Sequence, residues 1–291
     1  LKFMITQIDL DDPADIWTID GSLNTLSDRP GMDSQETNAF SMKIFHTFDG
    51  YELQSITSTT DTDVVLSYDA DWGNAKSHAP FIYDYFSATL RERETLSQEF
   101  RLISDTADFD SNKNYEWVLG LSYFDIKEMN LKNDDGIYGD PSDPFGPYAS
   151  ESTSSSSFSS DNLSIFGNLD YFFNESTKLS IGARWEDYES NYYDSFGESF
   201  NPSDKMSGGK ISLNKTASDA TNIFVSVARG FNQGGFNLNL GLAPGSQNGN
   251  LYYDPEFLTN YGLGWNATLF HSKMNISTVI FYSARDAQQV L

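Results

Sequence analysis

The feature that most constrains this sequence is a strict two-residue alternation of side-chain character that recurs along most of the chain. In one such stretch the residues on one face are Tyr115, Trp117, Leu119, Leu121 and Tyr123. The same alternation runs through residues 96–102, 179–186 and 261–269. Successive side chains of a strand point to opposite faces, so each stretch predicts a strand with one apolar face and one polar or small face. Helical spacing fits none of these stretches as well.

The pattern predicts eleven strands joined by connections that alternate between long and short. The predicted strands are residues 2–10, 38–48, 51–70, 92–104, 114–130, 161–173, 178–193, 206–215, 221–232, 256–269 and 273–287. The predicted long loops are Asp11 to Asn38, Asp71 to Arg91, Leu131 to Ser160, Asp194 to Lys205 and Asn232 to Pro255. Phe48 to Tyr51, Asp105 to Lys113, Asn174 to Thr177, Thr216 to Ala220 and the region around His271 form the short connections.

Sorting the loops by length in this way favours a membrane β-barrel. An up-and-down barrel of the outer-membrane type has short turns at one end and long loops at the other, with apolar residues facing lipid and polar residues facing the lumen. Several predicted strands also exceed the five or six residues usual in soluble sheets. A soluble or secreted β-sandwich shares the alternation but gives no reason for the loop sorting.

Composition excludes several other classes of protein. The 291 residues carry 18 Lys and Arg against 42 Asp and Glu, a formal charge of −24, which argues against nucleic-acid binding because that needs a basic footprint. No apolar run approaches the length of a membrane-spanning helix. The absence of cysteine excludes disulfides, thiolate metal sites and Cys nucleophiles. With aromatic residues at 15%, the chain is not disordered.

The sequence predicts neither an enzyme nor a resident cofactor or metal. It lacks the GxSxG, HExxH and Walker patterns, and its three histidines, His46, His78 and His271, show no ligand spacing. The acidic stretch from Asn133 to Pro144 offers oxygen ligands for calcium, but it lacks the ordered EF-hand pattern. A solvated charge run, continued by the serine-rich residues 150–160, is the favoured interpretation.

One region carries a recognisable signature. Residues 228–237 read ARGFNQGGFN, and residues 254–265 read DPEFLTNYGLGW. This pair resembles the barrel signature of TonB-dependent outer-membrane receptors. Two further stretches resemble the same family, SQEFRL at 97–102 with WVLGLSYF at 117–124, and FGNLDY at 166–171 with GARW at 182–185. The sequence departs from the family where Gly262 replaces a frequent Glu.

The signature residues expected to matter on this resemblance are Arg229, Gly230, Phe231, Gly234, Gly235, Phe236, Asn237, Pro255, Glu256, Asn260 and Tyr261. We expect the glycines to permit positive φ angles and close backbone approach where a strand opens into a loop, whether or not a ligand is near. Arg229 and Glu256 are candidates for a pair across the barrel wall, with a solvated rim charge as the alternative.

The resemblance implies an all-β fold, an antiparallel up-and-down transmembrane barrel. The family's barrel has 22 strands; we therefore expect residues 1–291 to form about half of it, a partial barrel domain without the plug domain and the remaining strands. It implies a bacterial outer-membrane location and a receptor that imports a scarce nutrient such as a ferric siderophore, cobalamin or an oligosaccharide. The implied partners are outer-membrane lipid, a small nutrient ligand and the TonB energy-coupling complex acting through the plug.

Aromatic side chains supply the candidate binding residues. Loop aromatics suited to stacking on a siderophore or sugar are Tyr138, Phe145, Tyr148, Tyr252 and Tyr253, although most loop aromatics only pack. Aromatics near strand ends that suit the interfacial girdles of a barrel are Trp117, Tyr123, Tyr171, Trp185, Tyr192 and Tyr193. The alternative function is a soluble or secreted carbohydrate-binding or adhesin-like sandwich, in which these aromatics belong to a core.

Overall fold

The computed structural model describes residues 1–14, 24–108, 113–236, 252–270 and 273–288. Its strands are β1 (Lys2–Asp12), β2 (Met32–Thr47), β3 (Tyr51–Asp69), β4 (Ile82–Ser104), β5 (Tyr115–Gly139), β6 (Tyr148–Asn174), β7 (Thr177–Asp194), β8 (Ser199–Phe200), β9 (Ser203–Ser218), β10 (Thr221–Asn232), β11 (Gly235–Phe236), β12 (Tyr252–Tyr253), β13 (Glu256–Leu269) and β14 (Met274–Asp286). Within the described ranges, no helix is long and apolar enough to cross a membrane.

Eleven long strands follow one another in a single antiparallel sheet. Their order is β1-β2-β3-β4-β5-β6-β7-β9-β10-β13-β14, while the short β8 pairs with β7, and β11 and β12 form a separate two-stranded sheet. The predicted meander of eleven strands is confirmed. The sheet does not close, because β1 and β14 lie at its two ends, so the fold is a partial barrel as expected.

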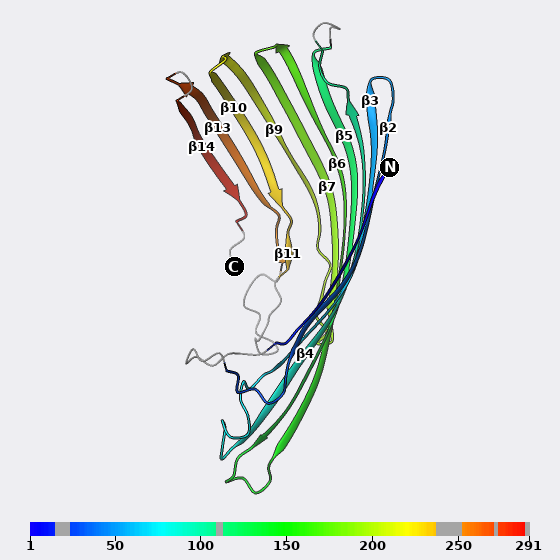
Figure 1. Ribbon diagram of the computed structural model, residues 1–291, viewed down its shortest axis with the longest axis vertical. Helices are drawn as coiled ribbons and strands as arrows, with labels where there is room; N and C mark the ends of the chain where they lie inside the picture. Colours follow the sequence, from blue (N-terminus) through cyan, green and yellow to red (C-terminus); the bar gives the residue numbers. More distant parts are fainter. Residues whose placement is uncertain (15–23, 109–112, 237–251, 271–272, 289–291) are drawn as a thin grey trace.

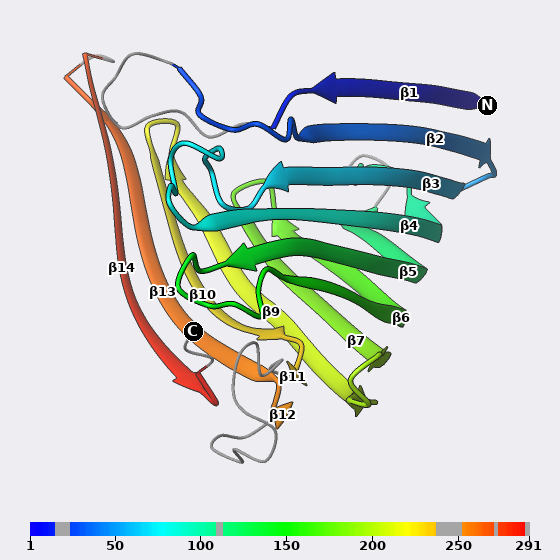
Figure 2. The ribbon, with the colours of Figure 1, turned by 90° about the horizontal axis from the view of Figure 1, so that it is seen from below.

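The sheet is one curved layer with a concave and a convex face (Figures 1 and 2). In Figure 1 the short turns lie at the top and the longer loops at the bottom. The tight turn at residues 48–50 is one of the predicted short connections, and Gly50 adopts a φ of 90° there. A residue with a side chain rarely tolerates that angle, which accounts for glycine at this position.

Cross-strand register assigns side chains to the two faces. Residues directly opposite each other on neighbouring strands share a face, so Leu119, Gly167 and Ala183 lie in one row. Phe158 of β6 and Tyr192 of β7 contact Phe236 of β11, and β11 lies inside the curve of the sheet (Figure 1). Their face is therefore concave, and the row of Leu119 is convex.

The convex face carries an exposed apolar band. Its members include Phe40, Ile44, Leu96, Phe100, Leu119, Leu121, Leu163, Ile165, Leu169, Ile181, Ile211, Leu213, Val225, Val227, Leu263 and Ile280. An apolar surface of this extent is stable only against lipid or another apolar body. On the concave face the most buried side chains are Met206, Ser164 and Ser190, so the small core of the molecule lies inside the curve.

Two predicted loops are wrong. The stretch from Asp71 to Arg91 was expected to be a loop, but β4 begins at Ile82; most of Leu131 to Ser160 belongs to β5 and β6, which turn at residues 140–147. Polar side chains do not prevent strand pairing, because the backbone supplies the ladder and the side chains find partners on a neighbouring strand or in a loop. Asp134 accepts a hydrogen bond from the Ser87 hydroxyl at 2.6 Å, and Asp135 binds Arg29 at 2.6 Å.

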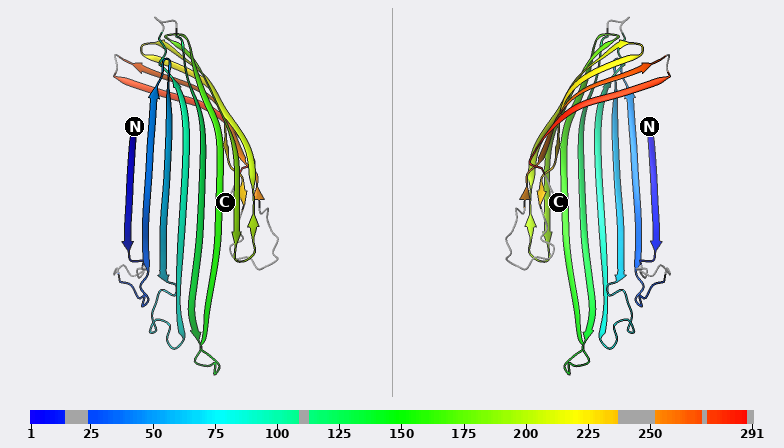
Figure 3. Two further views of the ribbon diagram at one scale, coloured as in Figure 1. Left: turned by 90° about the vertical axis from the view of Figure 1, so that its right-hand side faces the viewer. Right: turned by 90° about the vertical axis from the view of Figure 1, so that its left-hand side faces the viewer.

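These additions make the middle strands very long. β4, β5 and β6 have 23, 25 and 27 residues, whereas a tilted strand crosses the hydrocarbon with about nine to eleven. Figure 3 shows β5 and β6 reaching furthest on the loop side. The extra length therefore forms a wall that continues beyond the apolar band.

Candidate functional site

The signature segment folds back onto the concave wall. The Gln233 amide donates a hydrogen bond of 3.1 Å to Glu186, a carboxylate only 5% exposed that also accepts from Arg184 at 2.8 Å. Gly235 then pairs with Tyr253 in the β11–β12 sheet, and the Phe236 ring stacks on Phe200 at 4.9 Å. The segment is thus held by a hydrogen bond at one end and a ring stack at the other.

Close approach explains two of the three signature glycines. A Cβ on Gly234 would lie 2.7 Å from the Tyr253 carbonyl oxygen, and one on Gly235 would lie 2.6 Å from the Tyr253 hydroxyl. Neither glycine has a positive φ, so that part of the expectation is wrong. A Cβ on Gly230 would meet no atom within 4 Å, and the structure gives no spatial reason for glycine there.

Five rings, with Phe236 among them, form what we call the inner aromatic cluster. They are Phe158, Tyr192, Phe200, Phe236 and Tyr252. Phe200 is 3% exposed and Tyr192 8%, Phe158 and Phe236 are half-buried, and Tyr252 and its neighbour Tyr253 are exposed, so the centre of the cluster is packed core. Tyr192 therefore does not belong to a lipid-facing girdle, which corrects the expectation for that residue; the register places Trp117, Tyr123, Tyr171, Trp185 and Tyr193 on the convex face.

The proposed pair between Arg229 and Glu256 does not form. Glu256 binds Arg285 at 3.0 Å, while the Arg229 guanidinium lies 4.2 Å from the centre of the Phe257 ring. Arg229 lies on the convex face with its register partners, Gly209 and Thr259. Glu256 is three residues from Thr259 on β13, so its side chain lies on the concave face. Alternation along the strands therefore separates the two charges by the thickness of the sheet.

The other signature residues have structural contacts. Phe231 and Phe257 are register partners, the Asn260 amide donates to Ser283 at 2.7 Å, and the Tyr261 ring lies 6.3 Å from Tyr282. Pro255 lies against Gly234, since its Cδ would be 3.1 Å from a Cβ at that glycine. Asn237 lies outside the described residues.

A second group of rings lies at the loop end of β4, β5 and β6, and we call it the outer tyrosine cluster. Tyr83 is at its centre, 4.8 Å from Tyr85, 6.4 Å from Tyr138 and 5.1 Å from His78 between ring centres. Tyr148 is the register partner of Tyr138. Unbroken register along β6 places these tyrosines on the concave face with Phe158. Unlike the inner cluster it is open, with Tyr83 42% exposed.

The five predicted ligand aromatics thus divide between two places. Tyr138 and Tyr148 join the outer tyrosine cluster as strand residues rather than loop residues, and Phe145 projects from the turn between them, 85% exposed. Tyr252 and Tyr253 belong to β12 beside the inner aromatic cluster. Figure 3 shows the ends of β5 and β6 well beyond the turn that joins β7 to β9.

Hydrogen bonds fix the outer tyrosine cluster. The Tyr148 hydroxyl donates to Asp143 at 2.9 Å, and this bond raises the pKa of Tyr148. The Asp140 carboxylate accepts from the backbone N–H and the hydroxyl of Ser142, which lowers the pKa of Asp140. On the other side, Asp71 accepts from the Tyr85 N–H at 2.7 Å and lies 3.3 Å from His78 Nε2.

Two arginines lie below these tyrosines on the same concave face. Arg93 donates to Glu128 at 2.8 Å and Arg91 donates to Asn130 at 2.9 Å. Both arginine side chains remain nearly half exposed, although each forms an ion pair with Glu128. In a chain of net charge −24 they form a local basic patch, which favours an anionic group over a cationic one.

Sequence reasoning missed Tyr83, Tyr85 and Arg91 because it assigned residues 71–91 to a loop, and it did not single out Arg93 within the predicted strand 92–104. The run of strand-favouring residues Ile82, Tyr83, Tyr85 and Phe86 was the available signal. Among the described residues no three His, Asp or Glu side chains converge as a metal site.

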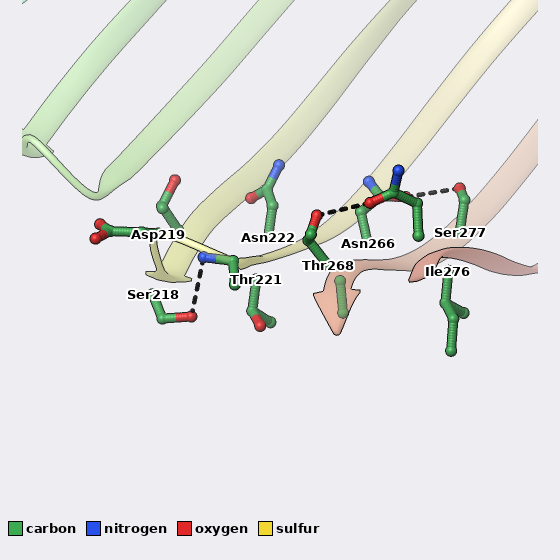
Figure 4. Close-up of a pocket in the computed structure, with 12 residues that line it drawn as sticks. Ser218, Asp219, Thr221, Asn222, Asn266, Thr268, Ile276 and Ser277 are labelled. Atoms are coloured by element: carbon green, nitrogen blue, oxygen red, sulfur yellow. Dashed lines mark hydrogen bonds between the residues drawn. The ribbon is translucent and has the colours of Figure 1, made fainter. Parts of the chain in front are cut away.

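A pocket of about 370 Å³ opens at the opposite, short-turn end, between β9, β10, β13 and β14. Asn, Ser and Thr line it, and Figure 4 shows the bond from Ser277 to Asn266 and the bond from Thr268 to Asn275. Four of its polar side chains are thus bonded in pairs, and the Ser218 hydroxyl accepts from the Ala220 N–H. The pocket lies far along the strands from the outer tyrosine cluster and does not belong to the same site.

Comparison with known proteins agrees with this architecture. The family described as TonB dependent receptor-like, beta-barrel matches residues 6–291. The chain therefore belongs to that family, and its location is the bacterial outer membrane. The single curved layer and this membership exclude the soluble sandwich.

Solved structures of similar fold include the ferric yersiniabactin uptake receptor FyuA from Yersinia pestis, with a TM-score of 0.60 and 15% identity over 90% of this chain and 38% of that one. The copper transporter OprC has a TM-score of 0.56 and 14% identity, covering 89% and 40%. The ferric preacinetobactin receptor BauA from Acinetobacter baumannii has a TM-score of 0.55 and 13% identity, covering 86% and 37%. The chain thus spans about two fifths of the structures it matches. No curated protein matches it.

Proposed function

We propose that this chain is part of the wall of a receptor that imports a scarce nutrient across the outer membrane, and that the nutrient is a ferric siderophore. The rest of the receptor supplies the remaining strands and a plug, through which the TonB complex provides energy. Family membership supports a receptor and transport role, and FyuA and BauA, named for uptake of ferric chelates, share the fold. Cobalamin and oligosaccharides are the alternative ligands.

The ligand class is inferred from the outer tyrosine cluster and from the two arginines that lie deeper on the same face. Exposed rings at the loop end of a concave wall offer stacking surfaces to an aromatic or planar ligand. Arg91 and Arg93 lie six and eight residues beyond Tyr85 on β4, roughly 20–26 Å deeper on the wall, and offer charge-assisted hydrogen bonds to carboxylate or phenolate oxygens. An anionic aromatic chelate uses the rings first and the arginines later, as it moves inward, whereas a neutral sugar uses only the rings.

The proposed contact sequence follows the geometry. A ligand arriving from outside meets Phe145 and Tyr148 first, then the ring of Tyr83, and only then the basic patch deeper on the wall. Asp143 holds the Tyr148 hydroxyl and Asp71 holds the β3–β4 connection, so the rings are positioned before the ligand arrives. Such preorganisation lowers the entropy lost on binding.

The test uses the receptor at its native length in detergent, with ligand binding followed by quenching of intrinsic fluorescence. Ferric catecholate and hydroxamate chelates, cobalamin and a maltooligosaccharide are titrated separately. We expect submicromolar binding of at least one ferric chelate, and a loss of about fivefold to tenfold for Tyr138→Ala. Tyr193→Ala, on the convex face and also exposed, is the matched control and should bind normally.

Binding of cobalamin or the oligosaccharide with no ferric chelate bound would overturn the ligand class. Equal affinities for Tyr138→Ala and Tyr193→Ala would overturn the role of the cluster.

A further inference from the structure

The polar pocket at the short-turn end, of about 370 Å³, has a floor made of one row of side chains. Thr216 of β9, Asn222 of β10 and Asn266 of β13 are successive register partners, and Ser277 of β14 continues the row. Asn222 lies seven residues before Arg229 on β10, so the row is on the concave face, opposite Arg229. Figure 4 shows Asn222 and Asn266 on the same side of the sheet.

Several hydrogen-bonding groups of this pocket have no partner within the described part of the chain. Asn266 and Asn275 each accept a bond from a neighbouring hydroxyl through Oδ1, at 2.6 and 3.0 Å, so their NH2 groups remain able to donate. Among the described residues, no hydrogen bond engages the side chain of Asn222 or of Thr216. The pocket therefore presents amide donors, an amide acceptor and a hydroxyl to a molecule that enters it.

The rest of the lining favours an uncharged ligand rich in hydrogen-bonding groups. Asp219, in the turn between β9 and β10, carries a carboxylate whose two oxygens accept hydrogen bonds from neighbouring hydroxyls of a ligand. None of the lining residues is Lys, Arg, His or an aromatic residue, so neither an anion nor a stacked ring finds a partner here. Ala220 adds a small apolar surface.

An N-acetylated amino sugar matches this set of groups. The carbonyl of its acetamido group accepts from an asparagine NH2, the N–H donates to the Asn222 amide oxygen, and the methyl group suits the apolar surface at Ala220. Its ring hydroxyls donate to Asp219. The volume lies at the lower end of the range for small-molecule sites, about 300–1,000 Å³, which suits one sugar unit of a longer chain.

The place of the pocket identifies the source of the sugar. Asn222 and Asn275 are the second residues of β10 and β14, so the pocket opens at the ends of the strands (Figure 1). The short turns of an outer-membrane barrel face the periplasm, where peptidoglycan is the polymer of N-acetylated amino sugars.

We propose that this pocket binds one N-acetylated sugar unit of a peptidoglycan glycan strand. A sugar fits better than an extended peptide, because a peptide pairs along the edge of a single strand, whereas the pocket crosses the ends of four strands. This inference concerns the periplasmic end of the wall and does not depend on the imported ligand.

The experiment measures binding to the receptor, at its native length in detergent, by saturation-transfer NMR titration. Chitotetraose, cellotetraose, peptide-free glycan strands from peptidoglycan and a peptidoglycan stem peptide are titrated separately. We expect chitotetraose and the glycan strands to bind. Cellotetraose, which has the same linkage but no acetamido groups, should bind at least about tenfold more weakly, because the pocket amides then lack partners. Asn222→Ala should weaken chitotetraose binding about tenfold, and Thr216→Val, which keeps the shape of the side chain, about threefold.

Asn214→Ala is the matched control. Asn214 is half-buried like Asn222 and lies on the concave face two residues before Thr216, but it is outside the pocket. This variant should bind chitotetraose like the unmodified receptor. Equal affinities for Asn222→Ala, Thr216→Val and Asn214→Ala, or for chitotetraose and cellotetraose, would overturn the site. Binding of chitotetraose without binding of the glycan strands would overturn the peptidoglycan source. A stem peptide that binds more tightly than either glycan and is sensitive to Asn222→Ala would assign the pocket to a peptide and overturn the proposed occupant.

Discussion

The inner aromatic cluster and the outer tyrosine cluster use the same kinds of side chain on the same concave face for different purposes. Around Phe236 the rings pack against one another, with Phe200 and Tyr192 buried, and they hold the signature segment against the wall. Around Tyr83 the rings touch at their edges and remain open. The difference teaches that an aromatic residue near a loop identifies a binding surface only when nothing of the chain's own already covers it.

The largest expected effect separates the clusters by stability. Phe236→Ala removes the ring that contacts Phe158, Tyr192 and Phe200, and we expect the β11–β12 sheet to lose about 2–3 kcal/mol of local stability. Hydrogen exchange at the amides of Gly235 and Phe236 measures this loss. Phe145→Ala, at the exposed turn, should leave the same amides unchanged. Unaltered protection in Phe236→Ala would show that the inner cluster is not the anchor.

A second test compares two glycines of one motif. In Gly234→Ala the new methyl carbon would lie 2.7 Å from the Tyr253 carbonyl oxygen. The backbone must move to relieve this clash. We expect a cost of about 1–3 kcal/mol to the β11–β12 sheet, typical of overpacking. Gly230→Ala places its methyl group in open space and should change stability by less than about 0.5 kcal/mol. Similar hydrogen-exchange profiles for the two variants would contradict the close-approach explanation.

The third test examines the outer tyrosine cluster, where we expect function to change without stability. Tyr83→Ala removes the central ring but leaves no packed cavity, so the unfolding midpoint in urea should remain within the change expected for about 0.5 kcal/mol. Ligand affinity should fall about fivefold, because one stacking contact contributes on the order of 1 kcal/mol. A large drop in the unfolding midpoint would place Tyr83 in a core like that of Phe236.

The smallest effect concerns pH at the turn that carries Phe145. The pKa of Asp140 is lowered by its hydrogen bonds to the backbone and hydroxyl of Ser142. Because the pKa is lower in the folded turn, the ionised carboxylate stabilises the turn above the ordinary pKa of Asp, and this contribution is lost as the pH falls through the folded value. A spin label at Phe145, which leaves Ser142 in place, should therefore become more mobile in acid. Asp140→Asn should abolish that change, and a label that stiffens on acidification would contradict the assignment.

Sequence reasoning reached the fold because its signal is carried by the strands themselves. The alternation at Leu119, Leu121 and Tyr123 predicts which side chains lie on each face of the strand, without knowledge of any partner strand. The signature segment likewise identified the place where a strand opens toward the interior. These features are local, and a single sequence contains them.

The binding surface was only partly predictable, because it depends on which residues the fold brings together. Tyr138 was identified as a candidate, but its neighbour Tyr83 lies in a stretch whose polar composition suggested a loop. Tyr252 was grouped with Tyr138, yet pairing with Phe200 places it elsewhere. Whether an aromatic side chain is buried decides whether it packs or binds. Its burial depends on the strand register and on where the loops fold back, and local composition predicts neither.

The most direct test of the account uses single cysteines, since the chain has none of its own. Fluorophore-labelled cysteines replace Ile223, Phe224, Val225, Ser226, Val227 and Ala228 of β10, one at a time, in the native-length receptor reconstituted into bilayers. Brominated lipid should quench the label at 223, 225 and 227 and leave 224, 226 and 228 largely unquenched. Quenching without a two-residue period, or strongest at the even positions, would contradict the assignment of the convex face to lipid.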